Sequence, residues 1–266
     1  MFDKSHFTPE SKLTKSKKAA IMFMLLRKRE GKQPKNMMQS EIRNNIKKIR
    51  AEISENPFGE KVQLIAATKT RTIEEIEEAI AGGADAIAEN KAQEFRDKND
   101  LLPQNAARHF IGRLQENKLK YIVGKVQLIH SCDSEKIAAA ISALSVRRGT
   151  VSNVLLEVNI GGEESKGGFS YAETEAAYRY VRALPNIKPC GLMAMLPAEI
   201  GEEAGGAMVR KMRALLDKIK AEDPDFSVLS MGMSGDYKLC VKYGSNAVRI
   251  GTGIFGERKS IVQAAE

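Results

Sequence analysis

The sequence has no tryptophan and only three cysteines among its 266 residues. Cys132, Cys190 and Cys240 are odd in number, lie far apart and form no C-x-x-C pair, which excludes a disulfide framework and favours a reducing compartment, so we expect a cytoplasmic protein. His130 and Cys132 form an isolated H-x-C pair without the further ligands of a zinc site. Both are therefore interpreted as ordinary strand residues, and no metal is expected.

Long apolar runs are also missing. The longest candidate, Ala19–Leu26, follows a basic start but has only eight residues and runs straight into "RKRE" without a small-residue cleavage site. It is predicted to be neither a secretory signal nor a membrane anchor. Because Met37 and Met38 stand just before a helical pattern, either could be the true start, and residues 1–36 are expected to be a poorly ordered basic extension.

The formal net charge of +8 lies almost entirely in that first segment. Residues 1–36 hold ten Lys and Arg against three Asp and Glu, which leaves 32 basic and 31 acidic residues in 37–266. The body of the protein is therefore nearly neutral. Since a nucleic-acid partner needs a basic face on the folded part, none is expected.

From residue 61 onward, short apolar runs alternate with longer amphipathic ones. The short runs predict eight strands, at 62–69, 86–89, 109–112, 126–131, 154–160, 189–195, 228–231 and 247–251. The longer runs predict seven helices, at 73–81, 92–101, 116–123, 134–145, 173–183, 203–221 and 237–243. Connections of this length imply a parallel sheet, and eight such units in about 200 residues favour a single-domain (β/α)8 barrel over 37–266. No glycine-rich dinucleotide fingerprint follows any strand, which argues against an open doubly wound sheet.

One further helix is predicted before the first strand. Ile42, Ile46, Ile49 and Ile53 recur at helical spacing within residues 39–53. We expect this extra N-terminal helix to pack on the barrel through its isoleucines.

Two glycine-rich loops suggest an anion site. Barrels of this kind carry their active face at the carboxyl ends of the strands and often bind phosphate after strands seven and eight. Here those loops read "SMGMSGD" and "VRIGTGIFG". Gly232, Gly251 and Gly253 would let backbone amides approach an anion, and Ser234 and Thr252 add hydroxyl donors. The pattern predicts a phosphate-bearing ligand, with ordinary turn glycines as the alternative.

A single lysine ends the first predicted strand, in "LIAATKTRT". Ile65, Ala67 and Lys69 share one face by the two-residue period, so Lys69 points into the barrel mouth if that face lines the interior. Burial and nearby cations there would lower the pKa of its ammonium and release a nucleophilic amine. Opposite a phosphate site, such a lysine suggests a Schiff base with pyridoxal 5′-phosphate, with a capping or ion-paired lysine as the alternative.

Seven motifs then add a resemblance. They are "AATKTRT", "AENKAQEF", "HFIGRLQENKLKYIVGKVQLIHSCDS", "LLEVNIGGEESKGGF", "GLMAML", "MGMSGD" and "AVRIGTGIFGER", in this order over residues 38–258. Together they resemble the pyridoxal phosphate homeostasis protein family (YggS/PROSC type), a single-domain barrel similar to the N-terminal domain of alanine racemase.

The resemblance implies a role for six residues. Lys69 would form the internal aldimine with pyridoxal phosphate, Arg249 would face the pyridine nitrogen, and Asn90 would lie beside the cofactor. The phosphate would be held by Ser234, Gly251 and Thr252. A fixed cation at the pyridine nitrogen disfavours its protonation and weakens the ring as an electron sink, which suits holding the cofactor better than carbanion chemistry.

Four positions depart from the family pattern, and one of them is Ala88, which stands where the family often has Gly. Thr68 and Thr72 stand where the family commonly has Ser and Pro, and the first exchange keeps the hydroxyl. Lys91 stands where the family often has Tyr, which puts the contact role of that position in doubt.

The function implied is a carrier with little or no turnover. It would bind pyridoxal phosphate reversibly, take part in intracellular homeostasis of the cofactor and deliver it to pyridoxal phosphate-dependent apoenzymes. No exposed apolar stripe stands out, so a monomer is expected.

The main alternative is an amino-acid racemase with Lys69 as one base. A racemase would need a second base, which alanine racemase takes from another subunit together with a β-domain. That domain is expected to be absent here. A sugar-phosphate enzyme with an aldolase-type Schiff base would need a carboxylate general acid, either Glu89 or Glu157.

Overall fold

The structure is a computed structural model of the chain, and it describes residues 35–163 and 166–257. Nearly all of the expected basic extension at 1–36 lies outside these residues. Within the described ranges, no helix is long and apolar enough to cross a membrane.

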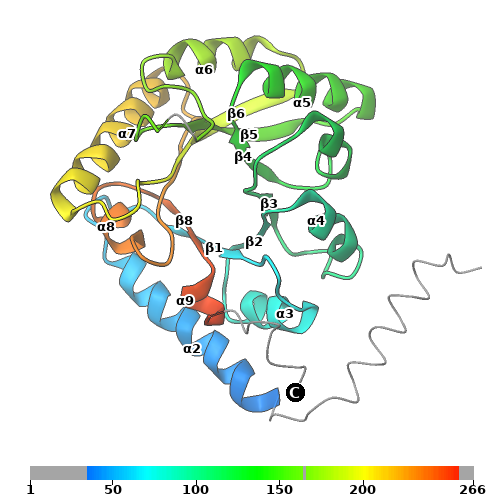
Figure 1. Cartoon of the computed structure of the whole chain (residues 1–266), viewed down its shortest axis with the longest axis vertical. Helices are drawn as coiled ribbons and strands as arrows, with labels where there is room; N and C mark the ends of the chain where they lie inside the picture. The colour runs from blue at the N-terminus through cyan, green and yellow to red at the C-terminus, as the bar shows by residue number, and fades with distance from the viewer. Residues whose placement is uncertain (1–34, 164–165, 258–266) are drawn as a thin grey trace, which may run out of the picture. The chain divides into compact units, whose positions relative to one another are not determined.

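Eight parallel strands close into a barrel in chain order, and the last strand pairs with the first (Figure 1). The strands are β1 Gln63–Ala67, β2 Ala86–Glu89, β3 Arg108–Phe110, β4 Leu128–Cys132, β5 Ser152–Val158, β6 Ile187–Ala194, β7 Val228–Ser230 and β8 Ala247–Ile250. The predicted (β/α)8 barrel is confirmed. Several strands end earlier than expected, because the polar residues at their carboxyl ends belong to the loops.

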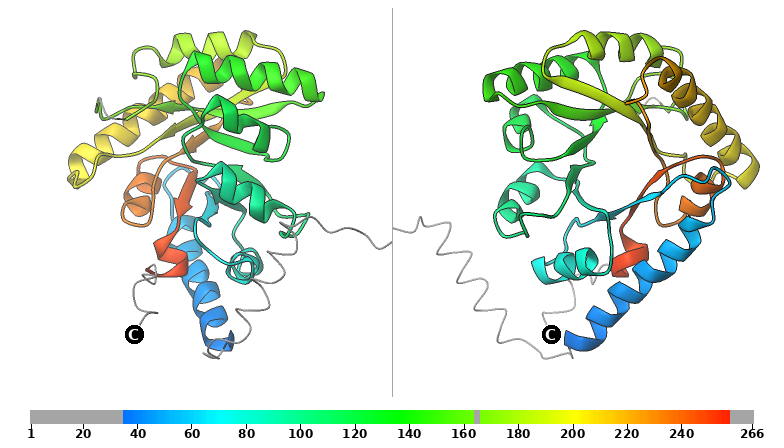
Figure 2. Two further views of the ribbon diagram at one scale, coloured as in Figure 1. Left: turned by 45° about the vertical axis from the view of Figure 1, so that its right-hand side comes forward. Right: turned by 180° about the vertical axis from the view of Figure 1, so that it is seen from behind.

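The helices lie around the outside of the strands (Figure 2). They are α2 Lys35–Ser54, α3 Ile73–Ala81, α4 Ala92–Asn99, the 3-10 helix η1 Glu116–Tyr121, α5 Glu135–Arg148, α6 Thr174–Ala183, α7 Glu202–Glu222, α8 Tyr237–Lys242 and α9 Thr252–Phe255.

Two of these elements differ from the prediction. The α-helix expected at 116–123 is the 3-10 helix η1, in which Ile122 N–H bonds Leu119 O three residues back. Gly124 then adopts a left-handed conformation at φ 72°, so the segment stops before an α-helix can extend. The four-residue helix α9 was not predicted, because its sequence "TGIF" is too short to carry a helical period.

The N-terminal helix packs on the barrel as expected. Ile42, Ile46, Ile49 and Ile53 are all buried. They form one apolar cluster with residues on the outer faces of β1 and β8, namely Leu64, Ala66, Val248 and Ile250. Helix α2 therefore covers the seam where the first and last strands meet.

The inner face of the barrel follows the other parity of the same strands. Ile65 of β1 packs with Ala86 and Ala88 of β2 and with Ala247 of β8. Since Leu64 and Ala66 face the outer layer, the two-residue period assigns Ile65 to the interior, which meets the condition attached to the prediction for Lys69. This alternation decides which side chains at the strand ends can reach the mouth.

Replacing Ile46 by alanine should lower the free energy of unfolding by about 2–5 kcal/mol, because the fully buried side chain leaves a cavity between α2 and the barrel. Urea unfolding followed by circular dichroism measures the change. Lys47→Ala is the matched control, because Lys47 is exposed on the same helix. Equal stability of the two variants would contradict the packing described here.

Candidate functional site

The residues predicted to bind the ligand gather at the carboxyl end of the barrel. Lys69 follows β1, Asn90 follows β2, and Arg249 lies in β8 just before Gly251. Because β1 pairs with both β2 and β8, these three strand ends are neighbours. A Cβ built on Gly251 would lie 3.6 Å from the carbonyl oxygen of Ala67, two residues before the lysine.

The loops after β7 and β8 are joined directly. The Gly253 N–H donates to Ser234 Oγ at 3.1 Å, which leaves the serine hydroxyl proton free to be donated elsewhere. A side chain at position 253 would come within 2.9 Å of Ile250 and 3.6 Å of Ser234 Oγ, so the glycine keeps this corner open. Thr252, which directly precedes Gly253, is exposed and carries a second hydroxyl. The hydroxyls of Ser234 and Thr252, together with the backbone N–H of Gly251, are donors of the kind that bind a phosphate group.

Lys69 lies in a β-turn rather than in the strand. Arg71 N–H bonds Thr68 O at 3.0 Å and closes the turn, with Lys69 and Thr70 as its central residues. The Lys69 side chain is exposed, so the expected burial is wrong, because β1 already ends at Ala67. Thr70 has φ 65°, a conformation that costs a β-branched residue about 1–3 kcal/mol.

The far side of this turn is fastened to the segment after β8. The Arg71 guanidinium donates to Gly256 O at 2.7 Å and to Phe255 O at 3.3 Å, and it lies 5.1 Å from the centroid of the Phe255 ring. The turn that carries Lys69 is therefore tied to helix α9, whose first residue is Thr252.

Thr72, which stands where the resembling family commonly has proline, starts helix α3. Its hydroxyl accepts the Glu75 N–H, and the Glu75 carboxylate accepts the Thr72 N–H. This reciprocal capping box stabilises the first turn of α3.

Arg249 is the buried cation of the site. Only 5% of the residue is exposed. Its Nη1 donates to Ser230 O at 2.7 Å and to Ser230 Oγ at 2.6 Å, and its Nη2 donates to Ala194 O at 3.2 Å. Burial lowers the pKa of the guanidinium, whereas the nearby Cys240 and Glu157 raise it. An arginine nevertheless remains charged in a protein. The three bonds hold this cation in a fixed orientation.

Two histidines extend the network from Arg249 across the barrel. His130 Nδ1 lies 3.0 Å from Ser230 Oγ, and His130 Nε2 lies 3.0 Å from His109 Nδ1. Since Arg249 donates to Ser230, the serine proton is available to His130, which can then donate to His109. His130 and Cys132 lie in strand β4, as interpreted, but the interior role of both histidines was missed. Their positions within predicted strands were the available signal.

The two carboxylates considered as general acids lie on opposite faces. Ala88 faces the interior, so Glu89 points outward, where it is 2% exposed and bonds Lys98 of α4 at 2.9 Å. A role for Glu89 at the barrel mouth is therefore wrong. Glu157 lies two residues after Leu155 in β5 and therefore points, like it, into the barrel. Burial and the nearby Asp133 raise the pKa of Glu157 to about 7, although the positive charge of Arg249 acts in the opposite direction.

Asn90 is exposed at the end of β2 beside the end of β3. A Cβ on Gly112 would lie 1.8 Å from the Asn90 carbonyl oxygen, so only glycine permits the two strand ends to approach this closely. The neighbouring Lys91 is exposed and precedes α4 without a capping bond from its side chain.

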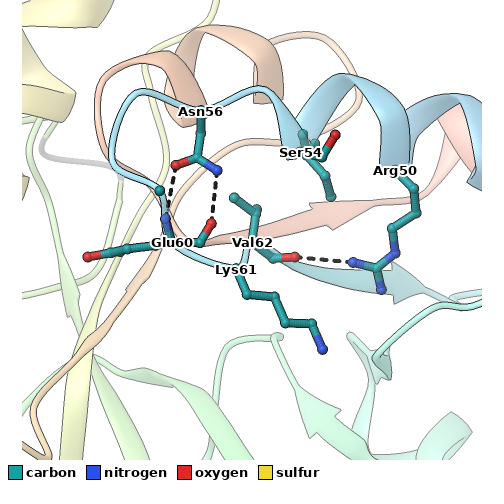
Figure 3. A pocket seen from close by; sticks show the side chains of 8 residues that line it. Arg50, Ser54, Asn56, Glu60, Lys61 and Val62 are labelled. Carbon is teal, nitrogen blue, oxygen red and sulfur yellow. Dashed lines mark hydrogen bonds between the residues drawn. The ribbon is translucent and has the colours of Figure 1, made fainter.

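One surface pocket lies away from these residues. It has a volume of about 360 Å³ and is lined by residues at the end of α2 and the entry to β1, including Arg50, Asn56, Glu60 and Val62 (Figure 3). Asn56 donates to Glu60 O at 2.8 Å and Arg50 to Val62 O at 3.1 Å, so these groups satisfy one another. The cavity is at the amino end of β1, opposite Lys69. Over the described ranges, no group of three or more His, Cys, Asp or Glu residues is arranged to hold a metal ion.

The buried histidines predict a loss of stability in mild acid. Burial lowers the pKa of His109 to about 4 and that of His130 well below its usual value. Between about pH 6.5 and 4 the unfolded chain binds protons that the folded protein does not, so the free energy of unfolding falls as the pH drops, by about 3 kcal/mol from His109 at the acid end. Urea unfolding at pH 7, 5.5 and 4.5 measures this slope.

His109→Asn should flatten the slope, since asparagine keeps an acceptor for His130 but does not titrate. The carboxylates contribute equally to both proteins, so the difference isolates the histidine. Identical slopes would contradict the assignment.

Comparison with known proteins supports one family. The chain matches the family described as alanine racemase, N-terminal domain, over residues 38–259. A pyridoxal phosphate homeostasis protein from Aquifex aeolicus is 42% identical over 199 residues, covering 74% of this chain and 87% of that protein. A pyridoxal phosphate homeostasis protein from Escherichia coli K12 is 33% identical over 228 residues, covering 82% of this chain and 97% of that protein.

Solved structures of related proteins also match the fold of this chain. PipY from Synechococcus elongatus, determined with PLP bound, matches with a TM-score of 0.70 at 28% identity, covering 81% of this chain and 100% of that one. Alanine racemase from Corynebacterium glutamicum gives a TM-score of 0.66 at 16% identity, covering 83% and 61%, which shows a shared fold alone. This chain therefore belongs to the pyridoxal phosphate homeostasis protein family, which has the fold of the alanine racemase N-terminal domain.

Proposed function

We propose that the protein holds pyridoxal 5′-phosphate at the carboxyl end of the barrel as a Schiff base with Lys69. In that step the Lys69 Nζ forms a C=N bond with the aldehyde carbon, and the aldehyde oxygen leaves as water. The observation that carries the proposal is the convergence of an exposed lysine, a buried arginine and a glycine and hydroxyl cradle on adjacent strand ends. The PLP-bound PipY relative supports the same ligand.

Each predicted residue has a task in this arrangement. Ser234, Gly251 and Thr252 are assigned to the phosphate, because Ser234 is bonded to Gly253, which directly follows Gly251 and Thr252 in the loop after β8. Asn90 lines the side of the site next to β2. Arg249 is assigned to the pyridine nitrogen, because its bonds to Ser230 and Ala194 hold the guanidinium inside the barrel, in the strand that leads to Gly251.

We further propose a carrier rather than an enzyme. Arg249 is fixed and permanently charged, and a cation at the pyridine nitrogen opposes the ring protonation that carbanion chemistry uses. The homeostasis names of the relatives support a non-catalytic role. In this proposal the protein works as a monomer in the cytoplasm, buffers the free aldehyde and passes it to apoenzymes that need it.

Lys69→Ala should abolish most of the absorbance band that the wild type acquires when it is mixed with pyridoxal phosphate, because no other predicted residue supplies an amine. Visible absorbance spectroscopy after removal of free ligand measures this. Lys125→Ala is the control, since Lys125 is exposed at the opposite end of the barrel, just before β4.

A wild type that takes up no pyridoxal phosphate would refute the proposal. Conversion of L-alanine to D-alanine faster than by free pyridoxal phosphate would replace the carrier with the racemase alternative.

Ser234→Ala and Thr252→Ala should each weaken retention of the cofactor by about 1–3 kcal/mol, the cost of losing one donor to a charged group. Equilibrium dialysis should show a dissociation constant raised roughly 5- to 150-fold. Ser54→Ala is the control, because its hydroxyl donates to Ala51 O at the end of α2, remote from the site. If neither variant changes retention, the phosphate assignment fails.

A further inference from the structure

The turn that carries Lys69 is hydrogen-bonded to the ammonium group of Lys98 in helix α4. Lys98 Nζ donates to Thr68 O at 2.9 Å, to Glu89 Oε1 at 2.9 Å and to Glu94 Oε1 at 2.6 Å. An ammonium has three protons, so every donor of this lysine is used. Lys98 is mostly buried, with 15% of its side chain exposed.

The two carboxylates that Lys98 binds hold the two neighbours of Lys69. Thr68 Oγ1 donates to Glu89 Oε1 at 2.7 Å, and Thr70 N–H donates to Glu94 Oε1 at 2.5 Å. Lys98, Glu89 and Glu94 thus form a closed set of bonds, here called the Lys98 clamp. Its bonds to the turn end on the residues immediately before and after Lys69.

The clamp includes features that lower the stability of the folded protein. Glu89 is 2% exposed, and its Oε2 is buried without a hydrogen-bond partner. An unsatisfied buried oxygen and a left-handed threonine both oppose folding, and apolar packing could fill the same space at lower cost. Departures of this kind in native proteins concentrate at functional sites.

The clamp also acts from outside the ligand site. Thr68 and Glu89 follow the outward parity of β1 and β2, whose inward positions are Ile65 and Ala88. Lys98 and Glu94 belong to α4, in the outer layer. The clamp therefore acts on the ligand end of the barrel through Thr68 and Thr70, the residues on either side of Lys69.

We propose that Lys98, Glu89 and Glu94 are positioning residues that preset the Lys69 turn, so that the amine waits where an arriving aldehyde can react. This inference rests on the proposed function. Orientation of this kind speeds a reaction without adding contacts to the ligand, because the cost of ordering the turn has been met in folding.

The first test needs no ligand. Lys98→Met removes the ammonium and keeps the length of the side chain, which should free the turn and accelerate exchange of the Thr70 amide proton at least tenfold, as measured by nuclear magnetic resonance. Arg96→Met is the matched control, because Arg96 is an exposed cation of the same helix that pairs with Asp97. Exchange at the wild-type rate in Lys98→Met would overturn the clamp.

The second test separates positioning from binding. Stopped-flow absorbance should show that Lys98→Met reacts with pyridoxal phosphate about 10- to 100-fold more slowly than the wild type. Its affinity for 4′-deoxypyridoxine phosphate, which has no aldehyde, should remain within about twofold, since the phosphate loops are untouched. Equal losses in both measurements would show a merely structural role and overturn the proposal.

Glu94→Ala is the second variant, because Glu94 is only half-buried and its loss should not prevent folding. It removes the acceptor of the Thr70 N–H and should reproduce the faster exchange and the slower reaction. A wild type that never reacts with pyridoxal phosphate would refute the proposed function, and the exchange rate of Thr70 would still decide whether the clamp holds the turn.

Discussion

The pairing of β8 with β1 is the contact on which the candidate site depends. It brings the end of the first strand, which leads to Lys69, beside the end of the last, which leads to Gly251 and Thr252. Helix α2 covers this seam from outside through its four isoleucines, and Arg71 bonds across it to the backbone of Phe255 and Gly256. Residues nearly 200 positions apart thereby form one end of the barrel, and the site exists only when the sheet is closed.

Charge is organised around that seam in two layers. Inside the barrel, Arg249 is a buried cation whose orientation is fixed by Ser230 and the Ala194 carbonyl. Outside it, Lys98 neutralises two carboxylates behind the turn. In the proposed site, Arg249 would face the ring of the bound ligand, and the Lys98 clamp would set the position of the Lys69 amine.

Much of this could be predicted because it depends on periodicity. The alternation in "LIAAT" placed Ile65 and Ala67 on one face of β1, and the helical spacing of the four isoleucines predicted the packing of α2. The same two-residue period, applied from Ala88, would also have turned Glu89 away from the mouth. These features are local, so a single sequence contains them.

What could not be predicted depends on how distant strands are aligned. The contact between His109 and His130 requires the register of β3 against β4, and their link to Arg249 requires that of β7 and β8. The exposure of Lys69 depends on a turn whose positive φ falls on a threonine, a residue that does not favour it. The clamp was invisible because its four-residue spacing, Glu94 to Lys98, looks like any surface ion pair of a helix.

The proposed role of Lys69 is tested most directly by identifying the residue that binds the cofactor. The wild-type protein would be mixed with pyridoxal phosphate, reduced with borohydride, digested and mapped by mass spectrometry. We expect one dominant phosphopyridoxyl group, on Lys69. Modification mainly of another lysine, or none at all, would contradict that role.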